Sequence, residues 1–164
     1  MSRLDSFIRR LEAQRACLGM AAKGIAPLAG PVLELGLGNG RTYDHLREVL
    51  PEREIFVFDR QVAAHPDCLP DPRHLFLGDI RETLREAARR LPGKAALAHS
   101  DMGSGDAEAN AELAASLAEL LPPLLLESAW VVADQRLKHA SLCPLPPPPG
   151  IAPDRYFLYR HEPR

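Results

Sequence analysis

Three glycines at alternate positions end the apolar segment Val32-Leu33-Glu34-Leu35-Gly36-Leu37-Gly38-Asn39-Gly40. The segment joins a predicted strand, residues 31–35, to a predicted helix, residues 41–50. In that context a glycine loop is typical of a ligand-binding turn, because Gly36 permits a tight turn and Gly38 lets the backbone approach a ligand closely. A purely structural turn would have the same pattern, so the glycines alone do not decide between the two.

Short apolar runs alternate with helix-like segments along the rest of the chain. The predicted strands cover residues 31–35, 55–58, 74–77, 95–98, 129–133 and 155–160, and the predicted helices cover residues 41–50, 80–91 and 107–121. Runs that are apolar throughout fit parallel strands covered on both faces. The alternation predicts an α/β fold with a doubly wound, mostly parallel sheet, helices on both faces and a ligand edge at the carboxyl ends of the strands.

An N-terminal helix is expected within residues 1–25. Apolar residues recur there at helical spacing after Ser2 and Asp5, which resemble a capping box. The apolar stripe is interrupted at Gln14 and Arg15.

Composition excludes several classes of protein. A net charge of −2 gives no electrostatic case for nucleic acid or an anionic membrane as a partner. No apolar run reaches the roughly 18 residues of a membrane span, and charges interrupt the first 22 residues, unlike a signal peptide. The chain has three cysteines, an odd number, and they are widely spaced: Cys17, Cys68 and Cys143. This pattern predicts neither a disulfide framework nor a zinc site. We expect one cytoplasmic domain, residues 1–164, without a metal; a homo-oligomer stays open.

Three acidic residues accompany the predicted strand ends. Glu34 would repel a pyrophosphate but would suit the sulfonium-bearing, zwitterionic end of S-adenosylmethionine. Asp59 follows Gly40 by nineteen positions (59 − 40), where an acid can accept hydrogen bonds from both ribose hydroxyls. Asp79 could accept from an adenine amino group while the Ile80 N–H reaches a ring nitrogen.

Each acid also has a plainer interpretation. Glu34 could be a salt-bridging or capping side chain, and Asp59 could be an exposed loop residue. Asp79, followed three residues later by Glu82, also has the pattern of a helix N-cap. Capping and ligand binding by Asp79 are compatible, because they can use different oxygens.

The order Glu-x-Gly-x-Gly-x-Gly, then an acid ending the second strand, then Gly78-Asp79, resembles the class I S-adenosylmethionine-dependent methyltransferases of Rossmann-like fold. Residues 33–46 are also similar to a small bacterial family whose members hold little more than this domain. The resemblance covers about residues 32–134 and implies methyl transfer that leaves S-adenosylhomocysteine (EC 2.1.1.-). It implies that the following residues bind the cofactor: Glu34, Gly36, Gly38, Asn39, Gly40, Asp59, Arg60, Gly78, Asp79, Ile80, Ser100 and Asp101.

The chain departs from the pattern of this family in its C-terminal part. The family's sheet usually has seven strands, but only about twenty residues separate Ala133 from Arg155. Six prolines lie within residues 143–153, so residues 143–154 are predicted to be a loop without regular structure. We therefore expect a sheet that can lack one C-terminal strand.

The end of the fourth predicted strand also departs from a family signature. The Asn/Asp-Pro-Pro-Tyr sequence that marks methylation of amide or base nitrogens is absent, and His99-Ser100-Asp101-Met102 stands in its place. His99 and Asp101 are the candidate catalytic residues, because either could take a proton from the acceptor. Asp101 could equally contact the methionine end of the cofactor. A loop and helix start without a chemical role is the other interpretation.

Two further classes of function stay open. A non-catalytic S-adenosylmethionine-binding module would fit the short chain and the missing signature. An NAD-binding Rossmann oxidoreductase would need a G-x-G-x-x-G spacing, but position 41 is Arg and Glu34 would crowd the phosphate. The sequence favours a methyltransferase that acts on an unidentified small-molecule acceptor, because no strongly basic surface points to a macromolecule.

Overall fold

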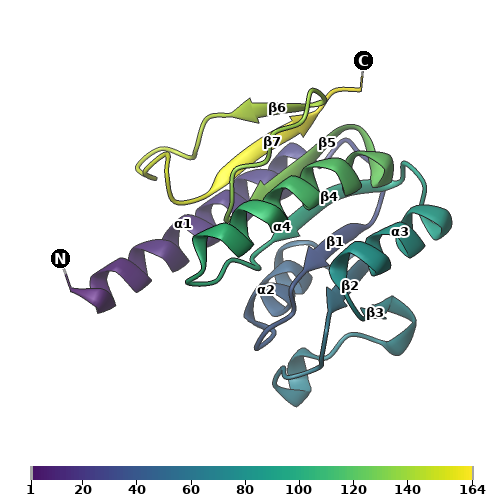
Figure 1. Cartoon of the computed structure of the whole chain (residues 1–164), viewed down its shortest axis with the longest axis horizontal. Helices are drawn as coiled ribbons and strands as arrows, with labels where there is room; N and C mark the ends of the chain where they lie inside the picture. Colours follow the sequence, from purple (N-terminus) through teal and green to yellow (C-terminus); the bar gives the residue numbers. More distant parts are fainter. Residues whose placement is uncertain (1, 164) are drawn as a thin grey trace.

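A mixed sheet organises the computed structural model, which describes residues 2–163 (Figure 1). The seven strands found there follow the order β3-β2-β1-β4-β5-β7-β6. Their bounds are Val32–Leu35 (β1), Ile55–Asp59 (β2), Leu75–Leu77 (β3), Ala95–Ser100 (β4), Leu125–Ala133 (β5), Leu142–Leu145 (β6) and Phe157–His161 (β7). Strands β1 to β5 pair in parallel, whereas β7 runs antiparallel between β5 and β6. The strand order reverses between β1 and β4, which is where a doubly wound sheet forms its ligand crevice.

Helices cover both faces of the sheet, as the sequence predicts. The four α-helices of the described residues are Arg3–Gly24 (α1), Ile80–Arg90 (α3), Ala107–Leu120 (α4) and Arg41–Val49 (α2), and short 3-10 turns lie at Pro66–Cys68, Pro72–His74 and Pro122–Leu124. One buried cluster joins α3 and α4 to the sheet through Leu84 and Leu117, and the other joins α1 and α2 through Leu18 and Leu46. In Figure 1 α4 accordingly lies in front of the sheet and α1 behind it.

The capping box at the start of α1 is confirmed. The Ser2 hydroxyl accepts a hydrogen bond from the Asp5 N–H at 3.0 Å, and the Asp5 carboxylate accepts one from the Ser2 N–H at 3.0 Å. The far end of the helix lies against β5, because a Cβ on Gly24 would fall 2.3 Å from the Trp130 ring. Within residues 2–163 no helix has both the length and the apolar character that crossing a membrane requires.

The expectation of a missing C-terminal strand is wrong. Leu142–Leu145 forms β6, so the first residues of the predicted loop 143–154 are regular structure, with Pro144 paired in register with Tyr159. An edge strand tolerates proline because one of its two sides has no ladder partner. The connection between β5 and β6, residues 134–141, is short because it contains no helix, and not because a strand is missing.

Candidate functional site

The glycine loop leaves β1 in a conformation that its glycines make possible. Gly36, Gly38 and Gly40 have φ values of +90°, +51° and +86°, a region that side chains disfavour. Asp59, at the end of the neighbouring β2, holds the loop: one carboxylate oxygen accepts the N–H groups of Leu37 at 2.9 Å and Gly38 at 3.1 Å. The acid that sequence analysis assigned to a ribose therefore also fixes the shape of the loop.

One cavity of about 390 Å³ lies on the β2 and β3 side of this loop. Four of the predicted cofactor-binding residues line it, namely Asp59, Arg60, Gly78 and Ile80. Asp79 lies between two of them but caps α3, since one oxygen accepts the Arg81 N–H at 2.9 Å. Its other oxygen lies 3.3 Å from the Arg60 guanidinium. The bond from the Arg81 backbone and the neighbouring arginines hold the pKa of the Asp79 carboxyl below its usual value.

A second cavity of about 300 Å³ lies between the glycine loop and α1. Its wall includes Gly36, Gly38 and Asn39 of the loop, Asp101 beyond β4, and four residues of α1: Phe7, Arg10, Leu11 and Gln14. Gly40 lines neither cavity; it packs against Cys68, whose Cβ would lie 2.5 Å from a Cβ at position 40.

The two cavities lie on either side of the place where Gly36 packs against Met102 and the backbone of Asp101. A Cβ on Gly36 would lie 2.9 Å from Cγ of Met102, and these two residues line the smaller and the larger cavity respectively.

The carboxylate of Asp101 is held by α1. Arg10 forms an ion pair with Oδ1, and Gln14 Nε2 donates to Oδ2 at 2.8 Å. Gln14 Nε2 also donates to the hydroxyl of Tyr156, at 2.7 Å. Sequence analysis did not select Arg10, Gln14 or Tyr156; the interruption of the apolar stripe at Gln14 was the one signal that could have found them.

Glu34 and His99 form a pair inside the sheet, and neither lines either cavity, although Thr42, which contacts Glu34, lines the one beside α1. Both side chains have an exposed fraction of 0%, and His99 Nδ1 lies 2.6 Å from Glu34 Oε2. The Thr42 hydroxyl donates to the other oxygen of Glu34, while Nε2 of His99 has no partner. Burial lowers the pKa of His99, but the charge and hydrogen bond of Glu34 outweigh it and hold this pKa above its usual value.

These positions bear on two of the predicted roles. The salt-bridging interpretation of Glu34 describes its contacts here, because both oxygens face protein groups. His99 has no exposed surface and lines neither cavity, so this structure gives the predicted proton transfer from an acceptor to His99 no direct route. Ser100 is also buried, within β4 between β1 and β5. Of the two candidate catalytic residues, only Asp101 lines a cavity.

Comparison with known proteins identifies the family. A family model described as S-adenosyl-L-methionine methyltransferase matches residues 1–161. The chain belongs to this family. A crystal structure of an S-adenosyl-L-methionine methyl transferase from Silicibacter pomeroyi DSS-3 is 47% identical, has a TM-score of 0.93, and the match covers 98% of this chain and 99% of that one.

More distant structures share the fold of this methyltransferase. Human methyltransferase-like protein 13 in complex with SAH (S-adenosylhomocysteine) has a TM-score of 0.60 at 12% identity, over 93% of this chain and 82% of that one. The antibiotic-resistance methyltransferase Kmr has a TM-score of 0.55 at 13% identity, over 92% and 93%. Among curated proteins, none matches. Membership of the family confirms S-adenosylmethionine as the cofactor and removes the NAD-dependent oxidoreductase as an alternative.

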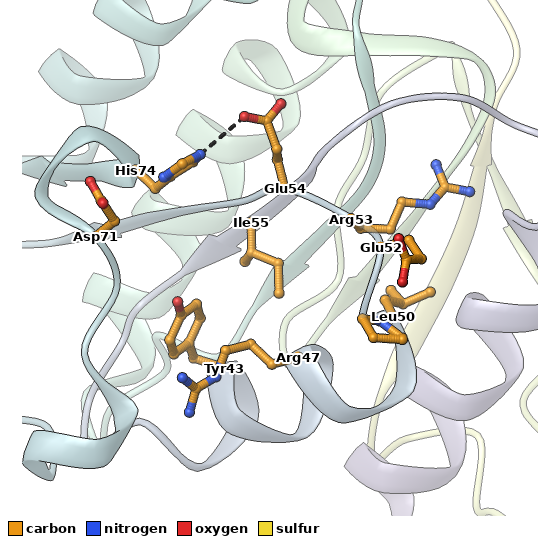
Figure 2. Close-up of a pocket in the computed structure, with 10 residues that line it drawn as sticks. Tyr43, Arg47, Leu50, Glu52, Arg53, Glu54, Ile55, Asp71 and His74 are labelled. Carbon is orange, nitrogen blue, oxygen red and sulfur yellow. Dashed lines mark hydrogen bonds and ion pairs between the residues drawn. The ribbon is translucent and has the colours of Figure 1, made fainter.

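A further cavity of about 490 Å³ lies where β2 begins, and no residue of the glycine loop lines it (Figure 2). Figure 2 shows Tyr43 and Arg47 of α2 on one side and the ion pair of His74 with Glu54, at 3.1 Å, on the other. Its charged groups are mostly satisfied by protein partners, as in the case of Arg53, which donates to two backbone carbonyls. None of the predicted site residues lines it, so the candidate site stays at the edge of the sheet that holds the glycine loop.

Replacing Gly36 with alanine is expected to destabilise the protein more than the same change at Gly38. Both have positive φ, which costs an L-residue about 1–2 kcal/mol, but only the Cβ on Gly36 would collide with Met102. A Cβ on Gly38 would meet nothing within 4 Å. Thermal unfolding of Gly36→Ala and Gly38→Ala provides the comparison; equal losses would show that Met102 moves aside without cost.

Proposed function

We propose that this methyltransferase transfers the methyl group of S-adenosylmethionine to a small-molecule acceptor. The observation that carries the proposal is the pair of cavities on the two sides of the packing of Gly36 against Met102, where an elongated ligand made of a nucleoside and an amino acid would place one end in each. The acceptor would share the cavity beside α1 with the methionine part of the cofactor, and this cavity measures only about 300 Å³ and has Phe7 and Leu11 in its wall. A recess of this size, bounded by a helix, suits a small molecule better than a polymer.

The adenosine part fits the cavity at the ends of β2 and β3. Asp59 accepts the N–H groups of Leu37 and Gly38 with one oxygen and those of Arg60, at 2.6 Å, and Gln61, at 3.4 Å, with the other. A carboxylate can accept about four hydrogen bonds, so ribose hydroxyls would have to take the place of some of these backbone donors. Gly78 and Ile80 would bound the adenine, and the side chain of Arg60 would lie at the rim. Binding of the ribose would thus be coupled to the shape of the glycine loop.

The methionine part fits the cavity beside α1. Gly36, Gly38 and Asn39 bring backbone to its wall, and Asp101 supplies a carboxylate that would attract an ammonium group. When bound, the cofactor supplies an electrophilic methyl group on a sulfonium, so the protein contributes chiefly alignment. Asp101 is the residue that we propose to face the reacting groups, either at the amino acid or at the acceptor.

The cytoplasm is the compartment that we propose for this reaction. Cys17 and Cys68 are free thiols, which fits a reducing environment. Burial raises the pKa of the Cys17 thiol to about 11, so that group is an inert part of the core.

Transfer of a labelled methyl group tests the proposed acceptor class. The protein is incubated with methyl-labelled S-adenosylmethionine and a cell extract that has been divided by ultrafiltration. We expect label in the small-molecule fraction, and none with an Asp101→Ala variant whose fold is intact. Label confined to the macromolecular fraction would contradict a small acceptor, and label in neither fraction would contradict catalysis.

A further inference from the structure

An amide lies buried among apolar residues on the inner face of α1. Gln14 has an exposed fraction of 7%, and its neighbours along this face include Ala13, Cys17 and Leu18, which are almost completely buried. An amide in such surroundings is unfavourable unless its hydrogen bonds are made, and an apolar side chain would fill the position at lower cost. The amide at position 14 therefore needs a reason beyond packing.

Two specific acceptors use the donors of Gln14. Nε2 donates to Asp101 Oδ2 at 2.8 Å and to the Tyr156 hydroxyl at 2.7 Å, so both hydrogens of the NH₂ group have partners. Asp101 follows β4 and Tyr156 precedes β7, so one side chain joins α1 to two separate segments at the loop edge of the sheet. Burial raises the pKa of Tyr156, which therefore stays protonated and neutral.

Arg10 completes the arrangement one turn earlier on the same helix. Residues four apart lie on one face of a helix, which lets Arg10 reach Oδ1 of Asp101 while Gln14 reaches Oδ2. Arg10 is half-exposed, with 39% of its side chain accessible, so solvent can replace it. Gln14 is buried, and so is Tyr156, whose side chain also interacts with Asp101, so the orientation of the Asp101 carboxylate depends chiefly on these two groups.

We propose that Gln14 is a positioning residue, which holds the Asp101 carboxylate toward the amino-acid end of the cofactor. The inference rests on the proposed function, in which the cavity lined by Asp101, Gln14 and Gly36 receives the methionine part. Gln14 does not act on the adenosine cavity, whose wall contains neither Gln14 nor Asp101. Its removal should therefore affect recognition of the amino acid and leave recognition of the nucleoside unchanged.

Two ligands separate these halves of the site. S-Adenosylhomocysteine carries the amino acid, and 5′-methylthioadenosine has the same nucleoside and sulfur without it. Isothermal titration gives the Kd of each for the wild type and for Gln14→Leu, which keeps the volume and removes both donors. We expect S-adenosylhomocysteine to bind about tenfold more weakly, as for the loss of one hydrogen bond to a charged group, and 5′-methylthioadenosine to keep its Kd within about twofold.

Cys17→Ala is the matched control, because Cys17 is buried on the same helix and lines neither cavity. It should destabilise the protein and leave both Kd values unchanged. If Gln14→Leu does not fold, Gln14→Met makes the same comparison, since it also removes the donors to Asp101 and Tyr156. Equal weakening of both ligands, or no weakening of S-adenosylhomocysteine, would overturn the positioning role. A wild type that binds neither ligand would instead refute the proposed function.

Discussion

Asp59→Ala is expected to remove most of the stabilisation that S-adenosylhomocysteine gives this methyltransferase. At a ligand concentration of 100 times the Kd, binding should add about 2.7 kcal/mol to the free energy of unfolding of the wild type. Two ribose hydroxyls bound to a carboxylate contribute about 1.5 kcal/mol or more each, so their loss weakens binding roughly 100-fold. At the same concentration the variant would gain only about 0.4 kcal/mol.

The variant should also be less stable without ligand, because Asp59 accepts the N–H groups of Leu37 and Gly38. Denaturant unfolding with and without S-adenosylhomocysteine separates this loss from the loss of binding, because it gives the increase in the free energy of unfolding that the ligand causes. An increase in Asp59→Ala as large as in the wild type would place the ribose contact on another residue.

Asp79→Ala is the control, because this carboxylate caps α3. Loss of the cap should cost about 1 kcal/mol while the ligand-induced shift remains. A shift that is lost in Asp79→Ala as well would show that the second oxygen of Asp79 binds adenine.

Much of the sheet could be predicted from the sequence because its central strands are apolar throughout. The strand formed by Leu142–Leu145 could not, since prolines conceal it and only its place at the edge of the sheet makes them tolerable. Its pairing with β7 depends on contacts between segments that are distant in the chain. Local patterns do not contain that information.

The candidate site likewise has a part that the sequence predicts and a part that only the folded structure shows. The glycine loop and Asp59 could be found because both depend on short-range spacing. The contact of Glu34 with His99 depends on the register of β1 with β4, which pairs these two residues directly. Gln14 and Tyr156 lie 142 positions apart, and only the packing of α1 across the sheet brings them together.

The buried pair of Glu34 and His99 leads to the second large expected effect, on stability. His99→Leu would leave the Glu34 carboxylate in the sheet with the Thr42 hydroxyl as its remaining partner. Removing one member of a buried ion pair costs about 3–5 kcal/mol, because the other charge stays desolvated. Urea unfolding at pH 7 should show a loss of this size.

Glu34→Leu combined with His99→Leu should be less destabilised than His99→Leu alone. Two apolar side chains replace a buried ion pair at little cost, so the second substitution recovers part of the loss. The strands pair these positions side by side, which makes the two changes strongly non-additive. A double variant as unstable as the sum of the single variants would mean that the two side chains do not interact.

The double variant also shows how the pair depends on pH, because it carries neither titrating group. Glu34 raises the pKa of His99 in the folded state, so the imidazolium stabilises the fold fully below the unfolded pKa of about 6.5. This contribution is lost as the pH rises through the higher folded value. The free energy of unfolding of the wild type, minus that of the double variant, should therefore fall from pH 6 to pH 9 in urea titrations. A difference that grows over this range would mean that burial dominates and that His99 is neutral in the fold, which would make Glu34 a lone buried charge held only by hydrogen bonds.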